Sequence, residues 1–104
     1  MNDQFIREMF YSLKKRKNMS KNKSYTAYLL KNPELIGKKI EEESSELIID
    51  FIKKNKEGVI NESADLIYHL LVLWVSSGID PKEVWEELSN RKLKSGFEEK
   101  NSRS

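Results

Sequence analysis

Residues 61–75, NESADLIYHLLVLWV, decide how this sequence folds, because a strongly apolar segment opens with two acids. From Leu66 to Val75 every side chain except His69 is aliphatic or aromatic, so the segment favours burial. Glu62 and Asp65 precede it at a spacing that places both on one side of a helix. A buried helix with acids on its face needs a partner that compensates their charge.

Composition limits what kind of protein this is. A chain of 104 residues forms one domain with a single core. Its 19 basic and 17 acidic residues leave a net charge of only +2, which favours neither a nucleic acid nor an acidic partner. The absence of cysteine excludes disulfides, thiolate metal sites and a cysteine nucleophile.

The N-terminal residues and the length of the apolar runs indicate a cytoplasmic location. Met1 is followed by polar residues rather than by the apolar core of a secretory signal. The longest uninterrupted apolar run, Leu70 to Val75, is much too short to cross a bilayer. We therefore expect a soluble, cytoplasmic protein that does not associate with membranes.

Apolar periodicity predicts an all-α protein, a bundle of four to five helices within a single domain spanning residues 1–104. Capping and turn residues set the expected limits. The predicted helices run from Phe5 to the basic run Lys14–Lys17, over residues 24–31, from Asn32–Pro33 to about Asn55, from Asn61 to Ser77 before Gly78, and from a capping box at Asp80, Pro81 and Glu83. We expect a break at Lys56–Gly58 and a flexible polar tail from about residue 95.

The predicted cores of these helices show two irregularities. In the helix after Pro33, an apolar stripe formed by Ile36, Ile40, Leu47 and Phe51 is interrupted by Glu43, so an acid stands at a core position. The helix that holds Leu66 to Val75 is apolar on every side, although a helix in a small bundle normally keeps one wet face. We therefore expect a homodimer in which a second copy covers the exposed side. The first helix should bury Phe5, and the last helix should turn Val84, Trp85 and Leu88 inward.

The acids of two helices should converge. Glu43 and Glu46 are spaced i, i+3 on one helix, and Glu62 and Asp65 repeat that spacing on the next. Like charges roughly 5 Å apart repel by about 3 kcal/mol at an effective dielectric constant of about 20. A divalent cation would relieve that repulsion, and ligands that are all hard oxygens favour Mg²⁺, or alternatively Mn²⁺, over zinc or copper. Carboxylate-bound magnesium usually keeps positions open for phosphates, which indicates phosphoanhydride or phosphoester chemistry.

Ordinary structural roles compete with each of these assignments. Runs such as Glu41–Glu43 are usually solvated, and Glu62 and Asp65 would also suit the first turn of a helix. His69 could be a core histidine, a partner of the acids or a phosphate contact. Lys39 could hold a phosphate or simply pair with a neighbouring acid. The basic run Lys14–Lys23 lacks interleaved aromatics and is better explained by solubility or a substrate-facing loop than by nucleic-acid binding.

Three motifs in this order and spacing resemble the phosphoribosyl-ATP pyrophosphohydrolase family of histidine biosynthesis, within the wider MazG-like all-α nucleotide pyrophosphatases. They are SYTAYLL (Ser24–Leu30), KIEEESSE (Lys39–Glu46) and NESADLIYHLLVLW (Asn61–Trp74), followed by VWEELSNR (Val84–Arg91) and GFEEK (Gly96–Lys100). The resemblance implies an all-α dimer that uses Mg²⁺ to hydrolyse the bond between the α and β phosphates of phosphoribosyl-ATP, giving phosphoribosyl-AMP and pyrophosphate.

The resemblance also implies roles for particular residues. Glu43, Glu46, Glu62 and Asp65 match the metal ligands, and Glu42 matches an adjacent acid; Glu42 or Glu46 is the expected general base. Lys39 matches a lysine that precedes the acids and is the candidate phosphate contact, while Ser24, Tyr25 and Thr26 match a segment near the substrate, which His69 is also expected to contact. The alternatives are a house-cleaning pyrophosphatase for nucleoside triphosphates, or a non-catalytic helical dimer that serves as an interaction module.

Overall fold

The computed structural model describes residues 3–92, and every regular element in that range is helical. The elements are α1 (Gln4–Lys15), the 3₁₀ turn η1 (Arg16–Asn18), α2 (Tyr25–Leu30), α3 (Pro33–Ile52), α4 (Lys56–Ser77) and α5 (Pro81–Lys92). The prediction of an all-α fold is confirmed. The predicted flexible tail lies outside the described residues.

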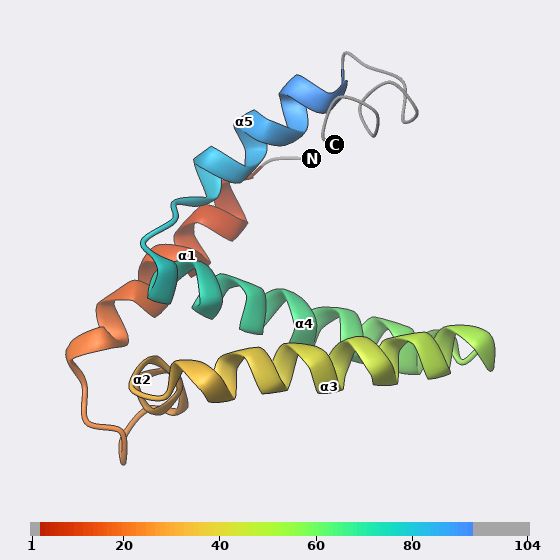
Figure 1. Cartoon of the computed structure of the whole chain (residues 1–104), viewed down its shortest axis with the longest axis horizontal. Coiled ribbons are helices and arrows are strands. Elements are labelled where there is room, and N and C mark those ends of the chain that lie inside the picture. The colour runs from red at the N-terminus through yellow and green to blue at the C-terminus, as the bar shows by residue number, and fades with distance from the viewer. Residues whose placement is uncertain (1–2, 93–104) are drawn as a thin grey trace.

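The two longest helices, α3 and α4, form an antiparallel hairpin that extends away from the other elements (Figure 1). The chain reverses at residues 53–55, where Lys54 takes a left-handed φ of 60°. The side chain of Asn55 then caps α4 by accepting a hydrogen bond of 3.1 Å from the Gly58 backbone. The predicted break at Lys56–Gly58 is therefore wrong, because those residues already form the first turn of α4.

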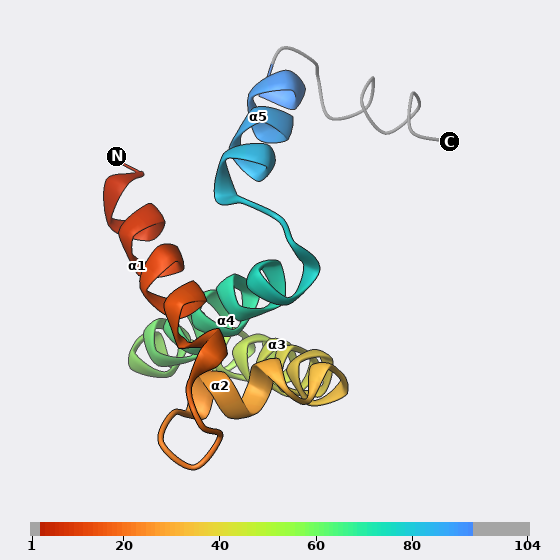
Figure 2. The same cartoon turned by 90° about the vertical axis from the view of Figure 1, so that its left-hand side faces the viewer.

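The core lies at the base of this hairpin, where α1 and α2 pack against it (Figures 1 and 2). Its buried members come from four helices: Phe10, Leu13, Leu29, Ile36, Leu71, Val72, Trp74 and Val75. The short helix α2 contacts both α3 and α4. It begins at Ser24, whose Oγ accepts a hydrogen bond from the Ala27 backbone at 3.1 Å. Burial at the base therefore fixes α2 beside the two helices that carry the acids.

The end of α4 and the start of α5 are formed by the capping residues that the sequence predicts. At the end of α4, Gly78 takes the left-handed conformation, with a φ of 71°. At the start of α5, Asp80 Oδ1 accepts from the Lys82 backbone, and Glu83 accepts from the Asp80 backbone, both at 2.9 Å. These bonds form the predicted capping box, except that the Asp80 side chain accepts from the amide one residue before Glu83.

Three apolar side chains that periodicity assigned to the core are instead exposed. Phe5 is 68%, Phe51 71% and Leu88 55% accessible. The expectations for these residues are wrong within a single copy, since periodicity identifies the apolar side of a helix but not whether another element covers it. Val84 and Trp85 pack partly buried against the core, as expected.

Candidate active site

The acids predicted to converge lie on facing parts of α3 and α4. A hydrogen bond with Glu46 is the largest influence that raises the pKa of Glu62, followed by burial and by the charges of Glu46 and Asp65. The pKa of Glu43 is also raised, mainly by burial and partly by the charge of Asp65, against the opposing effect of His69. The predicted acids thus influence one another across the hairpin.

Two buried carboxylate oxygens in this group have no aligned hydrogen bond: Oε2 of Glu62, and Oε1 of Glu43, which lies beside a nitrogen of His69. A buried carboxylate oxygen without a donor is costly, and a cation is one way to satisfy it. Within residues 3–92, no group of three or more acid or histidine side chains is placed to hold a metal ion as it stands. The donor chemistry and the unsatisfied oxygens fit a hard divalent cation, and the side chains would have to adjust around it.

His69 connects the acids to α2. Its Nδ1 lies 2.9 Å from the carbonyl oxygen of Asp65 and 2.6 Å from Oε1 of Glu43. Its Nε2 lies 3.3 Å from the hydroxyl of Tyr25. With 5% exposure and both nitrogens engaged, His69 could contact a phosphate only by giving up one of these partners.

The three predicted residues at the start of α2 differ in whether their side chains are accessible to a ligand. Ser24 is used as the helix cap, and Thr26 is buried with its hydroxyl 2.6 Å from that of Tyr68. Tyr25 is about half exposed, and its ring stacks with those of Tyr28 and Tyr68. Burial raises the pKa of Tyr25, which therefore stays protonated at neutral pH. Among these side chains, Tyr25 is the one a ligand can reach.

Lys39 and Glu42 lie at the solvent side of the group. Lys39 Nζ is 3.7 Å from a carboxylate oxygen of Glu42, and both side chains are substantially exposed. The positive charge of Lys39 lowers the pKa of both Tyr25 and Glu43, although burial raises both overall. Lys39 is thus close enough to the acids and to α2 to act on a ligand lying between them.

Two residues of this region were missed from the sequence. Asp50 contributes to the raised pKa of Glu62 and lies within 3.4 Å of the Asn55 amide at the tip of the hairpin. Its spacing of four residues after Glu46 was the available signal. Tyr68 stacks on Tyr25 and bonds Thr26, but its place in an apolar run carried no such signal.

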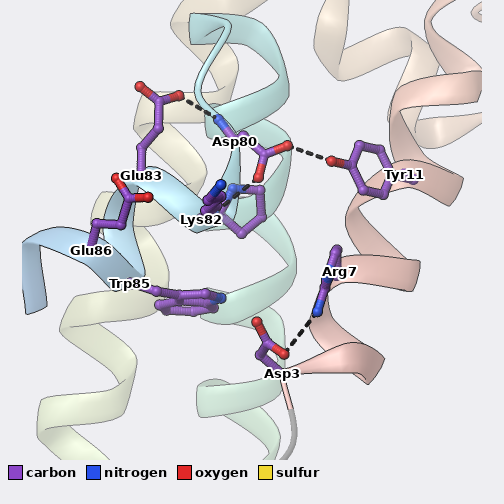
Figure 3. Close-up of a pocket in the computed structure, with 9 residues that line it drawn as sticks. Asp3, Arg7, Tyr11, Asp80, Lys82, Glu83, Trp85 and Glu86 are labelled. Atoms are coloured by element: carbon purple, nitrogen blue, oxygen red, sulfur yellow. Dashed lines mark hydrogen bonds and ion pairs between the residues drawn. The ribbon is translucent and has the colours of Figure 1, made fainter. Parts of the chain in front are cut away.

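A separate pocket lies between α1 and the start of α5 (Figure 3). The hydroxyl of Tyr11 donates to Asp80 at 2.5 Å, a bond that raises the pKa of Tyr11 and lowers that of Asp80. Arg7 pairs with Asp3 at 3.0 Å in the same pocket. The predicted site residues do not line it, and the bond between Tyr11 and Asp80 joins the start of α5 to α1.

Comparison with known proteins decides the family. Residues 6–92 match the family described as phosphoribosyl-ATP pyrophosphohydrolase. The chain belongs to the phosphoribosyl-ATP pyrophosphohydrolase family. The resemblance seen in the sequence motifs, and with it the prediction of a hydrolase, is therefore confirmed.

Relatives named phosphoribosyl-ATP pyrophosphatase extend over nearly the whole chain. The protein from Azospirillum brasilense is 40% identical over 96 residues, which are 91% of this chain and 86% of the relative. The protein from Paramagnetospirillum magneticum is 39% identical over 100 residues, covering 95% of this chain and 92% of the relative. Separately, none of the helices in residues 3–92 is both long enough and apolar enough to cross a membrane.

Proposed function

We propose that this chain hydrolyses the α–β phosphoanhydride of phosphoribosyl-ATP to phosphoribosyl-AMP and pyrophosphate, as a step of histidine biosynthesis in the cytoplasm. Membership of the family supports the substrate. The observation that carries the chemistry is the group of interacting acids on α3 and α4, which includes buried carboxylate oxygens without donors. Such a group suits a nucleotide that arrives with a divalent cation.

Glu43, Glu46, Glu62 and Asp65 are the residues that would hold the cation, with Mg²⁺ as the expected ion and Mn²⁺ as its substitute. Pyrophosphohydrolases of this family are generally metal-dependent. A bound Mg²⁺ supplies charge neutralisation on the phosphates and lowers the pKa of water. Oxygen-only donors are the ligands that both ions prefer.

The remaining side chains bind the substrate and move a proton. Glu42 or Glu46 accepts the proton of the attacking water, since both carboxylates are exposed enough to meet it. Lys39 binds a substrate phosphate in exchange for its exposed pairing with Glu42. Tyr25 offers an accessible aromatic face and a protonated hydroxyl on the α2 side. Positioning and charge stabilisation of this kind supply most of the catalysis in phosphoryl transfer.

We further propose that the protein works as a homodimer. The part of the α3–α4 hairpin away from the core exposes a group of large apolar side chains: Ile48, Ile49, Phe51, Ile52 and Ile60. Soluble monomers rarely leave so many neighbouring apolar residues in water. A second copy of the same hairpin would bury them by the two-fold packing common in helical dimers.

The decisive experiment measures pyrophosphate release from phosphoribosyl-ATP, with ATP and a set of dNTPs in parallel, in Mg²⁺ and in chelator. Selective, chelator-sensitive release from phosphoribosyl-ATP supports the proposal. Preference for dNTPs would assign the chain to the house-cleaning pyrophosphatases, and no release from any of these nucleotides would favour an interaction module.

A further inference from the structure

The imidazole of His69 is the one buried titratable group at the site whose role the proposed chemistry leaves open. Its ring is 5% exposed and touches groups on three helices: Glu43 on α3, the Asp65 carbonyl on α4 and Tyr25 on α2. It also meets the rings of Tyr25 and Tyr68 edge-on, at centroid distances of 6.0 and 4.9 Å. The ring is thus fixed both by packing and by polar contacts.

The hydrogen-bond partners determine which nitrogen carries the proton in the neutral ring. A backbone carbonyl can only accept, so Nδ1, at 2.9 Å from the Asp65 oxygen, carries the hydrogen. Nε2 then accepts from the Tyr25 hydroxyl at 3.3 Å. The polar chain therefore runs from Tyr25 to His69 and onward through the Nδ1 hydrogen.

That hydrogen faces two acceptors. Oε1 of Glu43 lies 2.6 Å from Nδ1, yet it receives no aligned hydrogen bond, because the hydrogen is directed at the Asp65 carbonyl. A small rotation of the Glu43 carboxylate would share it between both oxygens. No other hydrogen-bond donor to Oε1 of Glu43 is found among the described residues. The hydrogen on Nδ1 is therefore the donor available to orient this carboxylate.

We propose that His69 is a positioning residue, which orients the Glu43 carboxylate toward the other acids and links it through Tyr25 to the nucleotide-facing side of α2. The inference rests on the proposed function for the identity of the nucleotide, whereas the contacts of His69 support it independently. His69 on this account does not touch the phosphates. It keeps one oxygen of Glu43 against the ring, so that less side-chain entropy is lost when a metal ion binds.

Two substitutions of opposite character separate positioning from packing. His69→Asn places an amide N–H where Nδ1 stood but leaves a void where the rest of the ring was. His69→Leu fills much of the ring volume but has no donor. A purely structural histidine would tolerate leucine better than asparagine, whereas a positioning histidine would tolerate asparagine better than leucine.

The readouts are Mn²⁺ affinity of the nucleotide-free protein, measured by the paramagnetic resonance of free Mn²⁺, together with kcat, KM and Tm. We expect His69→Leu to weaken Mn²⁺ binding and to lower kcat by ~10–100-fold, the usual effect of removing an outer partner of a ligand. KM for phosphoribosyl-ATP should change much less. His69→Asn should recover most of the Mn²⁺ affinity although its Tm is lower than that of His69→Leu.

Tyr25→Phe tests the other end of the chain of contacts. It retains the stacked ring and removes only the hydroxyl, so kcat should fall by up to ~10-fold, the size of one hydrogen bond. Tyr28→Phe is the matched control, because Tyr28 stacks on Tyr25 without contacting His69. Its Mn²⁺ affinity and kcat should equal those of the unmodified protein.

The outcomes distinguish this inference from the proposed function. Equal losses of Mn²⁺ affinity in the asparagine and leucine variants, or losses confined to Tm, would overturn the positioning role. If the protein binds Mn²⁺ with the expected order of variants but hydrolyses dNTPs instead, the positioning role stands and the assignment of phosphoribosyl-ATP as substrate fails.

Discussion

Nδ1 of His69 on α4 lies 2.6 Å from Oε1 of Glu43 on α3. This contact joins the acid that interrupts the apolar stripe of α3 to the single histidine of the chain. The Glu43 side chain is 12% exposed, so the pair is largely removed from water. An acid at a core position is tolerated here because a polar partner from the next helix meets it.

Replacing Glu43 by glutamine should remove activity without unfolding the protein. We expect kcat to fall by at least ~10²-fold, as when one charge-stabilising group is lost. Burial raises the pKa of Glu43, so the neutral amide should raise the metal-free free energy of unfolding at neutral pH. Glu41→Gln, on the same helix but exposed, is the control. Full activity in Glu43→Gln would remove this residue from the site.

A divalent cation should stabilise the protein through Glu62. Binding at 100 times the dissociation constant adds about 2.7 kcal/mol to the free energy of unfolding. In Glu62→Gln that increase should largely disappear, because the amide lacks the negative charge that would bind the cation and that Glu46 repels. Glu57→Gln, an exposed acid earlier on α4, should keep the full increase. Thermal melts with Mg²⁺ and with chelator measure the difference, and an equal increase in both variants would exclude Glu62.

The helices and their caps could be predicted from the sequence because their signals are local. Asp80, Pro81 and Glu83 lie next to one another, and their capping box depends only on that neighbourhood. The end of α3 was misplaced because the reversal depends on Lys54 adopting a left-handed φ, which lysine side chains rarely do. Glycine favours a break in a helix, yet Gly58 lies inside α4, where a Cβ would come within 2.5 Å of Asp50.

For the candidate site, the sequence predicted which acids would lie on facing parts of two helices, but it did not predict their contacts. Equal spacing on two helices indicated that Glu43, Glu46, Glu62 and Asp65 would meet. Which side chain of α4 meets Glu43 depends on the register of the hairpin, and periodicity does not specify register. The pairing with His69 and its link to Tyr25 therefore emerged only from the three-dimensional arrangement.

The hydrogen bond between Tyr11 and Asp80 should make stability depend on pH. Tyr11 lowers the pKa of Asp80 in the folded state, so the unfolded chain binds the proton more readily. The stabilisation is complete above the unfolded pKa, roughly 3.9, and is lost as pH falls through the lower folded pKa. Tyr11→Phe should thus melt below the unmodified protein at pH 7, with a gap that closes in acid. A gap of constant size from pH 7 to pH 2 would assign the effect to packing alone.

Two glycines should respond oppositely to alanine. Gly78 has a φ of 71°, and open space surrounds the position of its Cβ, so Gly78→Ala should cost about 1 kcal/mol through backbone strain alone. Gly37 lies within α3, also with open space, and Gly37→Ala should gain about 1 kcal/mol from helix propensity. Melting temperatures should move apart by roughly 4–8 °C per kcal/mol. A higher melting temperature for Gly78→Ala would contradict the assigned end of α4.

A charge on the exposed end of the hairpin should separate the proposed dimer. Phe51 and Ile60 are 71% and 58% accessible in one copy, and each would be worth about 1.5–3 kcal/mol when buried. Phe51→Asp and Ile60→Asp should therefore weaken association by at least ~10-fold each. Asn61→Asp adds the same charge beside Ile60 without removing apolar surface, and it should leave association nearly unchanged. Sedimentation over a range of concentrations measures this, and an unmodified protein that stays monomeric at high concentration would exclude the dimer.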